Sequence, residues 1–279
     1  MPMDFAAVER EKPAYGRLKG RVALVTGVAR PRGVGAAVAR LFAREGADVC
    51  VTDVVSDCKE RAAEIVAAGG KASAYVADLT KLNEVEAMVE AIVKEKGKLD
   101  ILINVAGKSV PPRPSFLDMD MAYFDLVMDR NLRTAVHCCK AAVPRMVENN
   151  YGKIVNLGST TGPIGAYRYS SAYACSKAGM QAFGRALALE VGQYNITVNT
   201  IQPSDIDTGD VPWKPGDPAR DMGYFAPHLA PAMARPVRSE EVAQLALFLS
   251  SEESMAITGA SYLIDVGVTI VEGMINPPQ

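Results

Sequence analysis

The sequence predicts a single α/β domain in which a doubly wound parallel sheet is covered by helices on both faces. Three observations support this fold class. Short β-rich apolar runs alternate with longer amphipathic stretches along most of the chain. The strand candidates are nearly continuous in apolar residues, as expected of strands buried on both sides. No second apolar core, internal repeat or low-complexity tract interrupts the alternation, and 279 residues fit one α/β domain.

The N-terminal half contains the first four strand candidates and the helices between them. The expected strands are Arg21–Thr26, Asp48–Thr52, Ala72–Ala77 and Leu99–Val105. The expected helices are Val34–Gly46, Ser56–Ala68 and Leu82–Lys96. Gly69 and Gly70 end the second of these helices, because glycine readily adopts the conformation that closes a helix.

The C-terminal half continues the pattern and brings the sheet to about seven strands. The expected strands are Lys153–Leu157, Ile196–Ile201 and Ala260–Ile264. The expected helices are Met119–Glu148, Ala172–Tyr194 and Ser239–Leu249. We expect Pro144 to bend the first of these helices, and Ser239 to cap the last, with Glu241 in its first turn. Alternation of this kind implies right-handed crossovers between parallel strands.

Two segments lie outside the regular pattern. We expect residues 1–19 to form an N-terminal arm and residues 20–279 to form the domain. The stretch from Pro203 to Arg238 contains seven prolines and the aromatic residues Trp213, Tyr224 and Phe225. Because long irregular loops are often functional, residues 204–238 are predicted to form a lid over a substrate.

Composition excludes several classes of function. The net charge is −2, with 30 basic and 32 acidic residues, so a nucleic-acid partner is not expected. No apolar run reaches the length of a membrane span, and the N-terminus does not read as a signal peptide. The five cysteines lack CxxC spacing, which favours reduced thiols and a cytoplasmic location. With two histidines, a histidine-based metal site is not expected either.

The first strand leads into a glycine-rich turn that is typical of dinucleotide binding. Gly27 follows the strand, and Gly33, Val34 and Gly35 stand at the start of the next helix. Glycines at these places let a pyrophosphate approach the helix N-terminus, where free N–H groups favour anions. A tight turn without a ligand is the alternative, but the position after the first strand favours the binding site.

Acidic residues follow the second and third strands. Asp53 ends the second strand about twenty residues after the glycines, a position suited to accept the ribose hydroxyls of NAD. A helix-capping aspartate is the alternative. Asp78 and Leu79 follow the third strand and could flank an adenine, although this pair by itself indicates little.

Ser159, Tyr173 and Lys177 form the strongest pattern. Tyr173 and Lys177 are four residues apart in an expected helix, so they share one face. An ammonium beside a phenol favours the phenolate and lowers the pKa of the tyrosine. A shift of three units needs about 4 kcal/mol, which Lys177 and a cationic nicotinamide could supply together. A surface tyrosine with a solvated lysine is the alternative reading.

The motifs together identify a resemblance. The glycine turn, Asp53, Asp78–Leu79, Asn104-Val-Ala-Gly107, Asn131, Ser159, Tyr173/Lys177 and Pro203…Thr208 occur in this order. The chain resembles the short-chain dehydrogenase/reductase family, in its single-domain branch, over about Leu18 to Val268. The resemblance implies a Rossmann-type sheet of seven strands and the oxidation of alcohols or the reduction of carbonyls with NAD or NADP.

The resemblance also implies a role for each matching residue. Tyr173 would be the general acid/base, Lys177 would hold the nicotinamide ribose, and Ser159 would bind the substrate oxygen. Asn131 would anchor a water in a proton relay. The implied cofactor contacts are Gly27, Arg32, Gly33, Val34, Gly35, Asp53, Asp78, Leu79, Asn104, Ala106, Gly107, Tyr173, Lys177, Pro203, Ile206 and Thr208.

Some positions depart from the family pattern. Five residues, from Val28 to Arg32, separate the first two glycines where the family has three, so the phosphate loop should be larger. Ser204 replaces the usual glycine after Pro203. The larger loop is similar to that of the enoyl-reductase branch, but that branch has a tyrosine seven residues before the lysine, where this chain has Ser170.

The sequence therefore predicts an NAD-dependent enzyme that interconverts a secondary alcohol and a ketone, with a bulky or cyclic substrate. Asp53 favours NAD, because a 2′-phosphate would face a like charge. Arg30 and Arg32 favour NADP, because an arginine can bind that phosphate. An NADPH-dependent 3-oxoacyl-type reductase is the first alternative, and a dinucleotide sensor without turnover is the second. Family resemblance suggests a homotetramer built on 119–148 and 172–194, although a dimer stays open.

Overall fold

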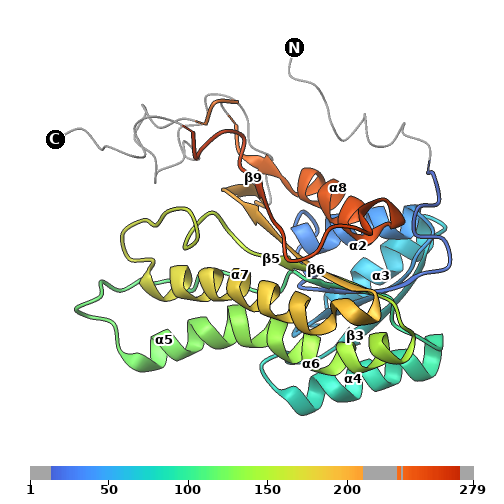
Figure 1. Cartoon of the computed structure of the whole chain (residues 1–279). Coiled ribbons are helices and arrows are strands. Elements are labelled where there is room, and N and C mark those ends of the chain that lie inside the picture. Colours follow the sequence, from blue (N-terminus) through green and yellow to red (C-terminus); the bar gives the residue numbers. More distant parts are fainter. Residues whose placement is uncertain (1–13, 210–230, 234, 271–279) are drawn as a thin grey trace.

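The centre of the computed structural model is a seven-stranded sheet with the order β3-β2-β1-β4-β5-β6-β9 (Figure 1). The model describes residues 14–209, 231–233 and 235–270. Every pairing in this sheet is parallel. The strands are β1 (Val22–Thr26), β2 (Asp48–Asp53), β3 (Lys71–Val76), β4 (Ile101–Asn104), β5 (Gly152–Leu157), β6 (Ile196–Pro203) and β9 (Ser261–Ile264). The predicted doubly wound parallel sheet in one domain is confirmed.

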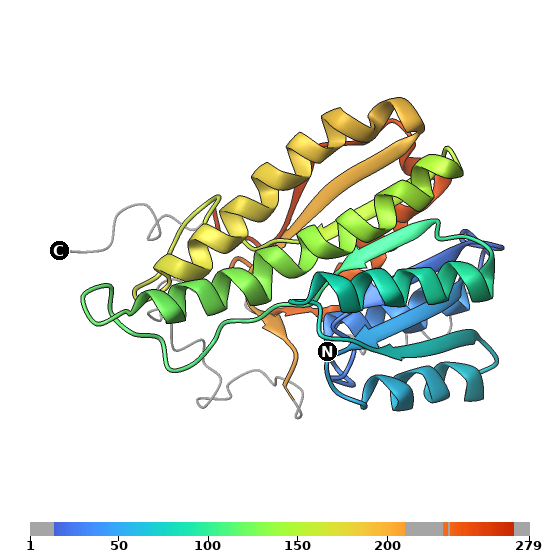
Figure 2. The ribbon, with the colours of Figure 1, turned by 90° about the horizontal axis from the view of Figure 1, so that it is seen from below.

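Helices cover the sheet on both faces (Figures 1 and 2). One face carries α2 (Val34–Arg44), α3 (Cys58–Ala67) and α8 (Ser239–Ser250). The other carries α4 (Leu82–Lys96), α6 (Thr134–Glu148) and α7 (Ser171–Val191), with α5 (Met121–Met128) beside α7. Alternate residues of each central strand supply the two cores: Ala23 and Val25 face the first helix layer, and Val22 and Leu24 face the second. This explains why the strands are apolar throughout.

The long helix expected over Met119–Glu148 is divided in the structure. A π-helical turn, Asp129–Arg133, separates α5 from α6. Pro144 lies inside α6, but the irregularity that divides the helix is centred on Asn131 instead. A π-turn adds one residue to a helical turn and is frequently found at functional sites. The sequence pattern did not indicate it, because a single extra residue hardly changes the helical period.

The start of α8 also differs from the expectation. Ser239 is the first helical residue and not the cap, which is Arg238. The carboxylate of Glu241 accepts the N–H of Arg238 at 2.9 Å and so satisfies one free donor of the helix end. The hydroxyl of Ser239 instead donates to the carbonyl of Arg32 at 2.7 Å, which joins α8 to the glycine-rich turn.

A small two-stranded parallel sheet flanks the end of β6. It consists of β7 (Ile206–Asp207) and β8 (Val237–Arg238), with Ile206 opposite Val237. Neither strand was expected, because each has only two residues. Residues 210–230, which include the aromatic residues of the predicted lid, lie outside the described residues.

At the N-terminus, the described part of the predicted arm packs on the domain. Leu18 is buried, and the carboxylate of Glu45 accepts the N–H groups of Tyr15 and Arg17 at 3.2 and 3.1 Å. Residues 1–13 lie outside the described part. Among the described helices, none combines the length and apolar character that a membrane span requires.

Candidate active site

Most of the predicted site residues follow the carboxyl ends of neighbouring parallel strands. Because these ends meet at one edge of the sheet, the loops after β1, β4, β5 and β6 lie at that edge, where folds of this kind usually bind ligands in a crevice outside the strand ends. Asp53 ends β2, Asn104 ends β4, and Pro203 ends β6. Ser159 lies in the loop after β5, and α7 brings Tyr173 and Lys177 to the same crevice.

The glycine-rich turn is shaped by close backbone contacts. A Cβ at Gly35 would lie 2.4 Å from the carbonyl oxygen of Gly27, so only glycine lets α2 begin against the end of β1. Gly27 has a positive φ of 72°, and a Cβ there would lie 2.9 Å from Ala106. Gly33, with Val34 next to it, caps the N-terminus of α2 without a side-chain hydrogen bond to that end. The glycines thus bring the start of α2 close against the end of β1 and the Ala106 backbone, and the first N–H groups of the helix point out from this turn without intrahelical acceptors.

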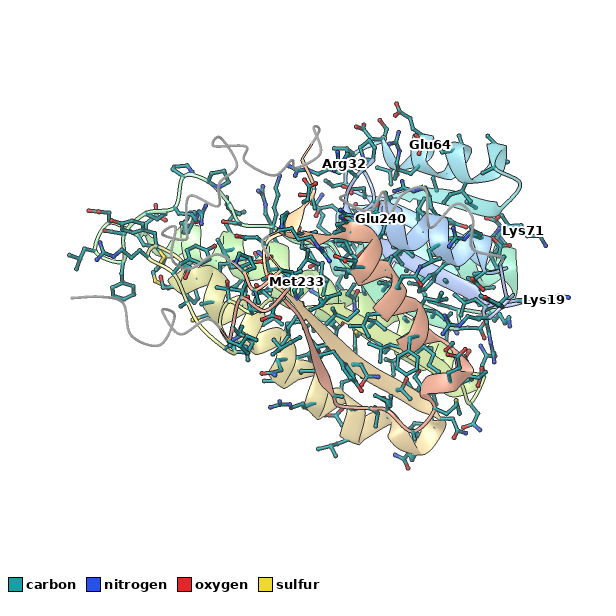
Figure 3. All side chains as sticks on the ribbon, turned by 90° about the horizontal axis from the view of Figure 1, so that it is seen from above. Lys19, Arg32, Glu64, Lys71, Met233 and Glu240 are labelled. Carbon is teal, nitrogen blue, oxygen red and sulfur yellow. The ribbon has the colours of Figure 1, made fainter. Side chains whose placement is uncertain are left out.

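Arg32 and Asp53 are both held by partners in the structure. The guanidinium of Arg32 forms a 3.0 Å ion pair with Asp207 of β7, and Figure 3 shows Arg32 near the start of α8. The two carboxylate oxygens of Asp53 accept the N–H groups of Ala29 and Val54 at 2.9 and 2.8 Å. The enlarged loop is therefore fastened to β2 at one side and to β7 and α8 at the other.

Asp78 and Leu79 make local contacts after β3. The carboxylate of Asp78 accepts the N–H and hydroxyl of Thr80 at 3.0 and 2.7 Å, and the hydroxyl bond lowers its pKa most. Leu79 is buried, and its carbonyl oxygen lies 3.0 Å from Nδ1 of His137. Asp78 thus shapes the turn before α4, and a contact to adenine would come in addition to this role.

The Asn104-Val-Ala-Gly107 segment is bound to its neighbours on both sides. The hydroxyl of Thr26 accepts the N–H groups of Val105 and Ala106, each at 3.0 Å. The amide of Asn104 donates to Asn156 of β5 at 2.9 Å inside the sheet. Asn104 is therefore buried as a brace between strands, whereas the backbone of Ala106 and Gly107 borders the crevice near Gly27. The sequence analysis did not assign this role to Thr26. A threonine at the end of a buried strand, next to the glycine turn, could have indicated it.

Asn131 lies in the π-helical turn and is fully buried. Its amide nitrogen donates to the carbonyls of Lys108 and Val127 at 3.1 and 3.0 Å. A Cβ at Gly107 would lie 2.7 Å from Oδ1 of Asn131, and this oxygen has no hydrogen-bond partner among the described residues. A buried acceptor of this kind is suited to an ordered water, as the predicted relay role requires.

Tyr173, Ser159 and Lys177 come together at the crevice. Ser159 is close enough to the phenol of Tyr173 to lower its pKa, and the Ser159 hydroxyl accepts the N–H of Thr161 at 3.0 Å. Gly162 has a φ of 104°, and a Cβ there would lie 2.4 Å from the carbonyl of Ala174, so glycine brings the Ser159 loop onto α7. The ammonium of Lys177 lies 5.7 Å from the centroid of the Tyr173 ring and donates to the carbonyl of Leu157 at 2.7 Å.

Burial dominates the titration of this pair. Burial raises the pKa of Tyr173 to about 12, against a smaller lowering by the nearby Ser159. Burial also lowers the pKa of Lys177 to about 8. The lowered tyrosine pKa that the sequence pattern predicted is thus not a property of the chain alone, because desolvation outweighs the nearby ammonium. In this state the phenol keeps its proton at neutral pH and can donate it.

The segment after β6 forms the remaining side of the crevice. The carbonyl of Pro203 accepts the N–H of Thr160 at 3.0 Å, which joins it to the Ser159 loop. Ile206 is half-buried in β7, and the N–H of Thr208 donates to the carbonyl of Ile206 at 2.9 Å. Ile206 therefore lies on the short strand that Arg32 contacts through Asp207, and Thr208 follows directly after that strand.

Sequence reasoning missed Asp205, between Pro203 and Ile206. Its carboxylate interacts electrostatically with Tyr173 and with Arg113, and burial raises its pKa. Arg113 stands over the ring of Tyr167 at 5.1 Å, so the loops after β4 and β5 meet through this pair. The sequence shows an acidic residue two positions after Pro203, the end of β6, and this position could have marked Asp205 as a site residue.

The shape of the site fits a dinucleotide. The N-terminus of α2, which glycines bring close to the end of β1, suits a pyrophosphate, because helix N-termini bind anions through free N–H groups. The carboxylate of Asp53 accepts a hydrogen bond from Ala29 of the same turn. The ammonium of Lys177 lies 5.7 Å from the centroid of the Tyr173 ring. The arrangement can hold a nucleotide along the turn and exchange a proton with a bound oxygen at Tyr173.

Comparisons with known proteins agree with this geometry. A family model described as enoyl-(acyl carrier protein) reductase matches residues 27–269. The oxidoreductase UcpA of Salmonella typhimurium is 34% identical over 93% of this chain and 98% of its own length. An NAD-dependent glycerol dehydrogenase of Listeria innocua is 36% identical over 90% and 94% of the two chains.

Solved structures show the same fold. A short chain dehydrogenase from Mycobacterium smegmatis superposes with a TM-score of 0.77 at 29% identity, over 91% of this chain and 95% of the other. Members of the family shown by these matches use NAD or NADP and act on small molecules. The chain therefore belongs to the short-chain dehydrogenase/reductase family and is an oxidoreductase of the alcohol dehydrogenase or carbonyl reductase kind.

Proposed function

We propose that the protein is an NAD-dependent oxidoreductase that interconverts a secondary alcohol and a ketone. The observation that carries this proposal is the buried ammonium of Lys177, 5.7 Å from the centroid of the Tyr173 ring, together with Ser159, which is close enough to the phenol to lower its pKa. Such a pair of hydroxyls can hold one substrate oxygen and exchange one proton with it.

Each residue of the site has a separate proposed role in binding or proton transfer. Ser159 orients the substrate oxygen, and Tyr173 donates its proton to a carbonyl or removes one from an alcohol. Lys177 holds the ribose next to the nicotinamide, and Asn131 anchors a water that links the site to solvent. When bound, the nicotinamide accepts or delivers the hydride. Gly27, Gly33, Val34 and Gly35 bind the pyrophosphate, and Ile206 and Thr208 bind the carboxamide side.

Two sets of contacts, at Asp53 and at Arg32, support NAD over NADP as the cofactor. The N–H groups of Ala29 and Val54 hold the carboxylate of Asp53 at the end of β2, so it cannot easily turn away from a 2′-phosphate. Arg32, one of the side chains that could neutralise such a phosphate, is paired with Asp207. Arg30 is exposed and supports the NADP alternative.

The substrate is proposed to be a bulky or cyclic alcohol. Exposed apolar and aromatic side chains in the loops after β4 and β5, among them Phe116, Leu117 and Tyr169, support such a substrate. An NADPH-dependent 3-oxoacyl-type reductase is the alternative within the family. Enoyl reduction is less well supported despite the description of the matching family model, because Ser170 stands where that chemistry needs a tyrosine.

The active form is proposed to be a homo-oligomer in the cytoplasm, with a tetramer favoured. Exposed apolar side chains on α5 and α7, among them Met121, Leu126 and Leu189, support an interface on this helical layer. All five cysteines are free, which supports a reducing compartment. Light scattering after size exclusion measures the mass directly.

The experiment that tests the function is a substrate panel with NAD(H) and NADP(H), followed by the absorbance of the reduced nicotinamide. We expect oxidation of secondary alcohols and reduction of the matching ketones, with higher kcat/KM for NAD(H). Reduction of 3-oxoacyl thioesters in preference to all alcohols and ketones would favour the alternative. Binding of cofactor without turnover of any compound would favour a sensor.

A further inference from the structure

The turn that follows α8 is fastened to the amino ends of the sheet strands by side-chain contacts. This turn consists of the short helix Glu252–Ser254 and of Met255. The carboxylate of Glu252 forms a 2.6 Å ion pair with Arg21, the residue before β1. The amine of Lys153, near the start of β5, donates to the sulfur of Met255 at 3.4 Å. The first contact is thus an ion pair, whereas the second has a neutral thioether as its acceptor.

Lys153 reaches this sulfur from inside the protein. Its exposed fraction is 0%, and it stands opposite Ile101 of β4 and Thr197 of β6. In the part of the chain that the structure describes, no oxygen accepts a hydrogen bond from the amine, and the buried hydroxyl of Thr197 has no partner either. Burying a polar group is costly unless it is hydrogen-bonded, and a thioether is a weak acceptor. The buried amine therefore lacks a strong acceptor.

Met255, in contrast, lies at the surface. Its exposed fraction is 47%, so a small solute can reach the side chain from solvent. Peroxide oxidises methionine to the sulfoxide, which carries a polar oxygen on the sulfur atom. Here that oxygen would be bonded to an atom 3.4 Å from the amine of Lys153. Oxidation thus places a strong acceptor where the amine has a weak one.

We propose that Met255 is an oxidation site at which hydrogen peroxide forms a sulfoxide, and that Lys153 binds the new oxygen and thereby stabilises the fold. The S–O bond forms as the O–O bond of the peroxide breaks, and the sulfur is oxidised by two electrons. The leaving hydroxide takes the proton of the transferred oxygen and becomes water. Reductases of methionine sulfoxide can reverse the change. The site lies at the amino ends of the strands, away from the proposed dinucleotide site, and does not depend on the proposed function.

The expected effect is opposite in sign to the common effect of methionine oxidation. Oxidation usually destabilises a protein, because a polar group replaces an apolar one in a packed contact. At Met255 about half of the side chain already faces water, and the atom that contacts the sulfur is an amine. Met121 of α5 is a suitable comparison. Its exposed fraction is 64%, and no described N–H or O–H group donates to its sulfur.

The first test introduces a permanent acceptor. Glutamine has a carbonyl at the position of the methionine sulfur, so Met255→Gln imitates the sulfoxide. We expect scanning calorimetry to show a rise of roughly 2–4 °C in melting temperature, the shift that one net hydrogen bond produces in a domain of this length. Met121→Gln is the matched control and should change the melting temperature little. An unchanged or lower melting temperature of Met255→Gln would overturn the inference.

A double-mutant cycle tests whether Lys153 is the partner of the new acceptor. In the Lys153→Met background the amine is absent, so Met255→Gln should no longer raise the melting temperature. Circular dichroism shows whether each variant is folded. A gain of the same size in both backgrounds would mean that the amine does not bind the acceptor, and the inference would be wrong.

The second test uses the modification itself. The full-length protein is treated with hydrogen peroxide, and mass spectrometry of its peptides measures oxidation at each methionine. We expect Met255 to be oxidised together with Met121 and well before the fully buried Met146. Treatment should also increase the difference in melting temperature between the wild type and Met255→Leu, because the other methionines are the same in both proteins.

Two results of the peroxide experiment would contradict the inference. One is a Met255 that stays reduced while Met121 is oxidised. The other is a difference in melting temperature between the wild type and Met255→Leu that falls or stays the same on oxidation. Neither test measures oxidoreductase activity, so the outcome for Met255 and the outcome for the proposed function are separate.

Discussion

The ammonium of Lys177 lies 5.7 Å from the centroid of the Tyr173 ring, but its hydrogen bond goes to the carbonyl of Leu157. The lysine is thus anchored on the end of β5 rather than on the tyrosine. Burial moves the two groups toward their uncharged forms, raising the pKa of Tyr173 to about 12 and lowering that of Lys177 to about 8. The phenol of Tyr173 therefore keeps its proton at neutral pH.

Replacing Tyr173 by Phe keeps the ring and removes the proton that is exchanged. We expect kcat to fall by roughly 10² to 10⁴, the usual contribution of a general acid/base, while cofactor affinity is retained. Steady-state kinetics and fluorescence titration with NADH measure the two quantities. Tyr194→Phe, at the far end of α7, serves as the control. Near-normal turnover of Tyr173→Phe would exclude the assignment.

Lys177→Met should stabilise the fold while abolishing turnover. The lysine titrates near pH 8 in the folded chain and at 10.5 in a model peptide, so its burial opposes folding fully below about pH 8. As the pH rises from 8 to 10.5, the folded state releases the proton first, and this penalty of up to about 3 kcal/mol disappears.

Urea unfolding across this pH range measures the effect. The free-energy gap between Lys177→Met and the wild type should be largest near neutral pH and shrink toward alkaline pH. Lys59→Met, which removes an exposed lysine of α3, should show a small gap without this dependence. A variant that is less stable than the wild type at neutral pH would contradict the expectation.

Cofactor preference depends on Asp53 and on the pairing of Arg32 with Asp207. We expect higher kcat/KM with NAD than with NADP in the wild type, and a narrower gap in Asp53→Ala, because the charge facing a 2′-phosphate is removed. Asp207→Asn should also improve the use of NADP, because Arg32 is released from its ion pair. Arg32→Ala should change the ratio little. A wild type that prefers NADP would refute this assignment.

Gly35→Ala should damage the cofactor site, because the new Cβ would lie 2.4 Å from the carbonyl of Gly27. Moving α2 away from β1 disturbs the N–H groups at the start of the helix, so we expect weaker NAD binding and a loss of about 1–3 kcal/mol in stability. Gly192→Ala is the matched control, since nothing lies within 4 Å of a Cβ there. Calorimetric titration with NAD and thermal unfolding compare the two variants, and equal effects would contradict the steric argument.

Lys153→Met should raise the melting temperature. Lys153 is fully buried at the start of β5, burial lowers its pKa, and its amine donates to the sulfur of Met255 at 3.4 Å. An apolar side chain of similar length avoids the cost of burying an amine with so weak a partner, which we expect to be worth about 1–3 kcal/mol. Differential scanning calorimetry measures the change, with Lys59→Met again as the comparison. A lower melting temperature would mean that the amine has a stabilising role.

The sequence by itself determined the fold class and the order of the chemical groups. Strands buried on both faces need continuous apolar runs, and parallel strands need long crossovers, so the alternation of the two is visible in one dimension. The positions of Ser159, Tyr173 and Lys177 follow from the same logic, because a strand end and a helical spacing of four residues place them. Family membership rests on these local patterns.

Only the tertiary structure decided which groups meet across long distances in the chain. Arg32 pairs with Asp207, Ser239 donates to Arg32, and Arg113 stands over the ring of Tyr167. None of these contacts follows from spacing, because each depends on how separate loops pack at the sheet edge. The raised pKa of Tyr173 has the same origin: the sequence shows the neighbouring lysine, whereas desolvation depends on everything that packs around the phenol.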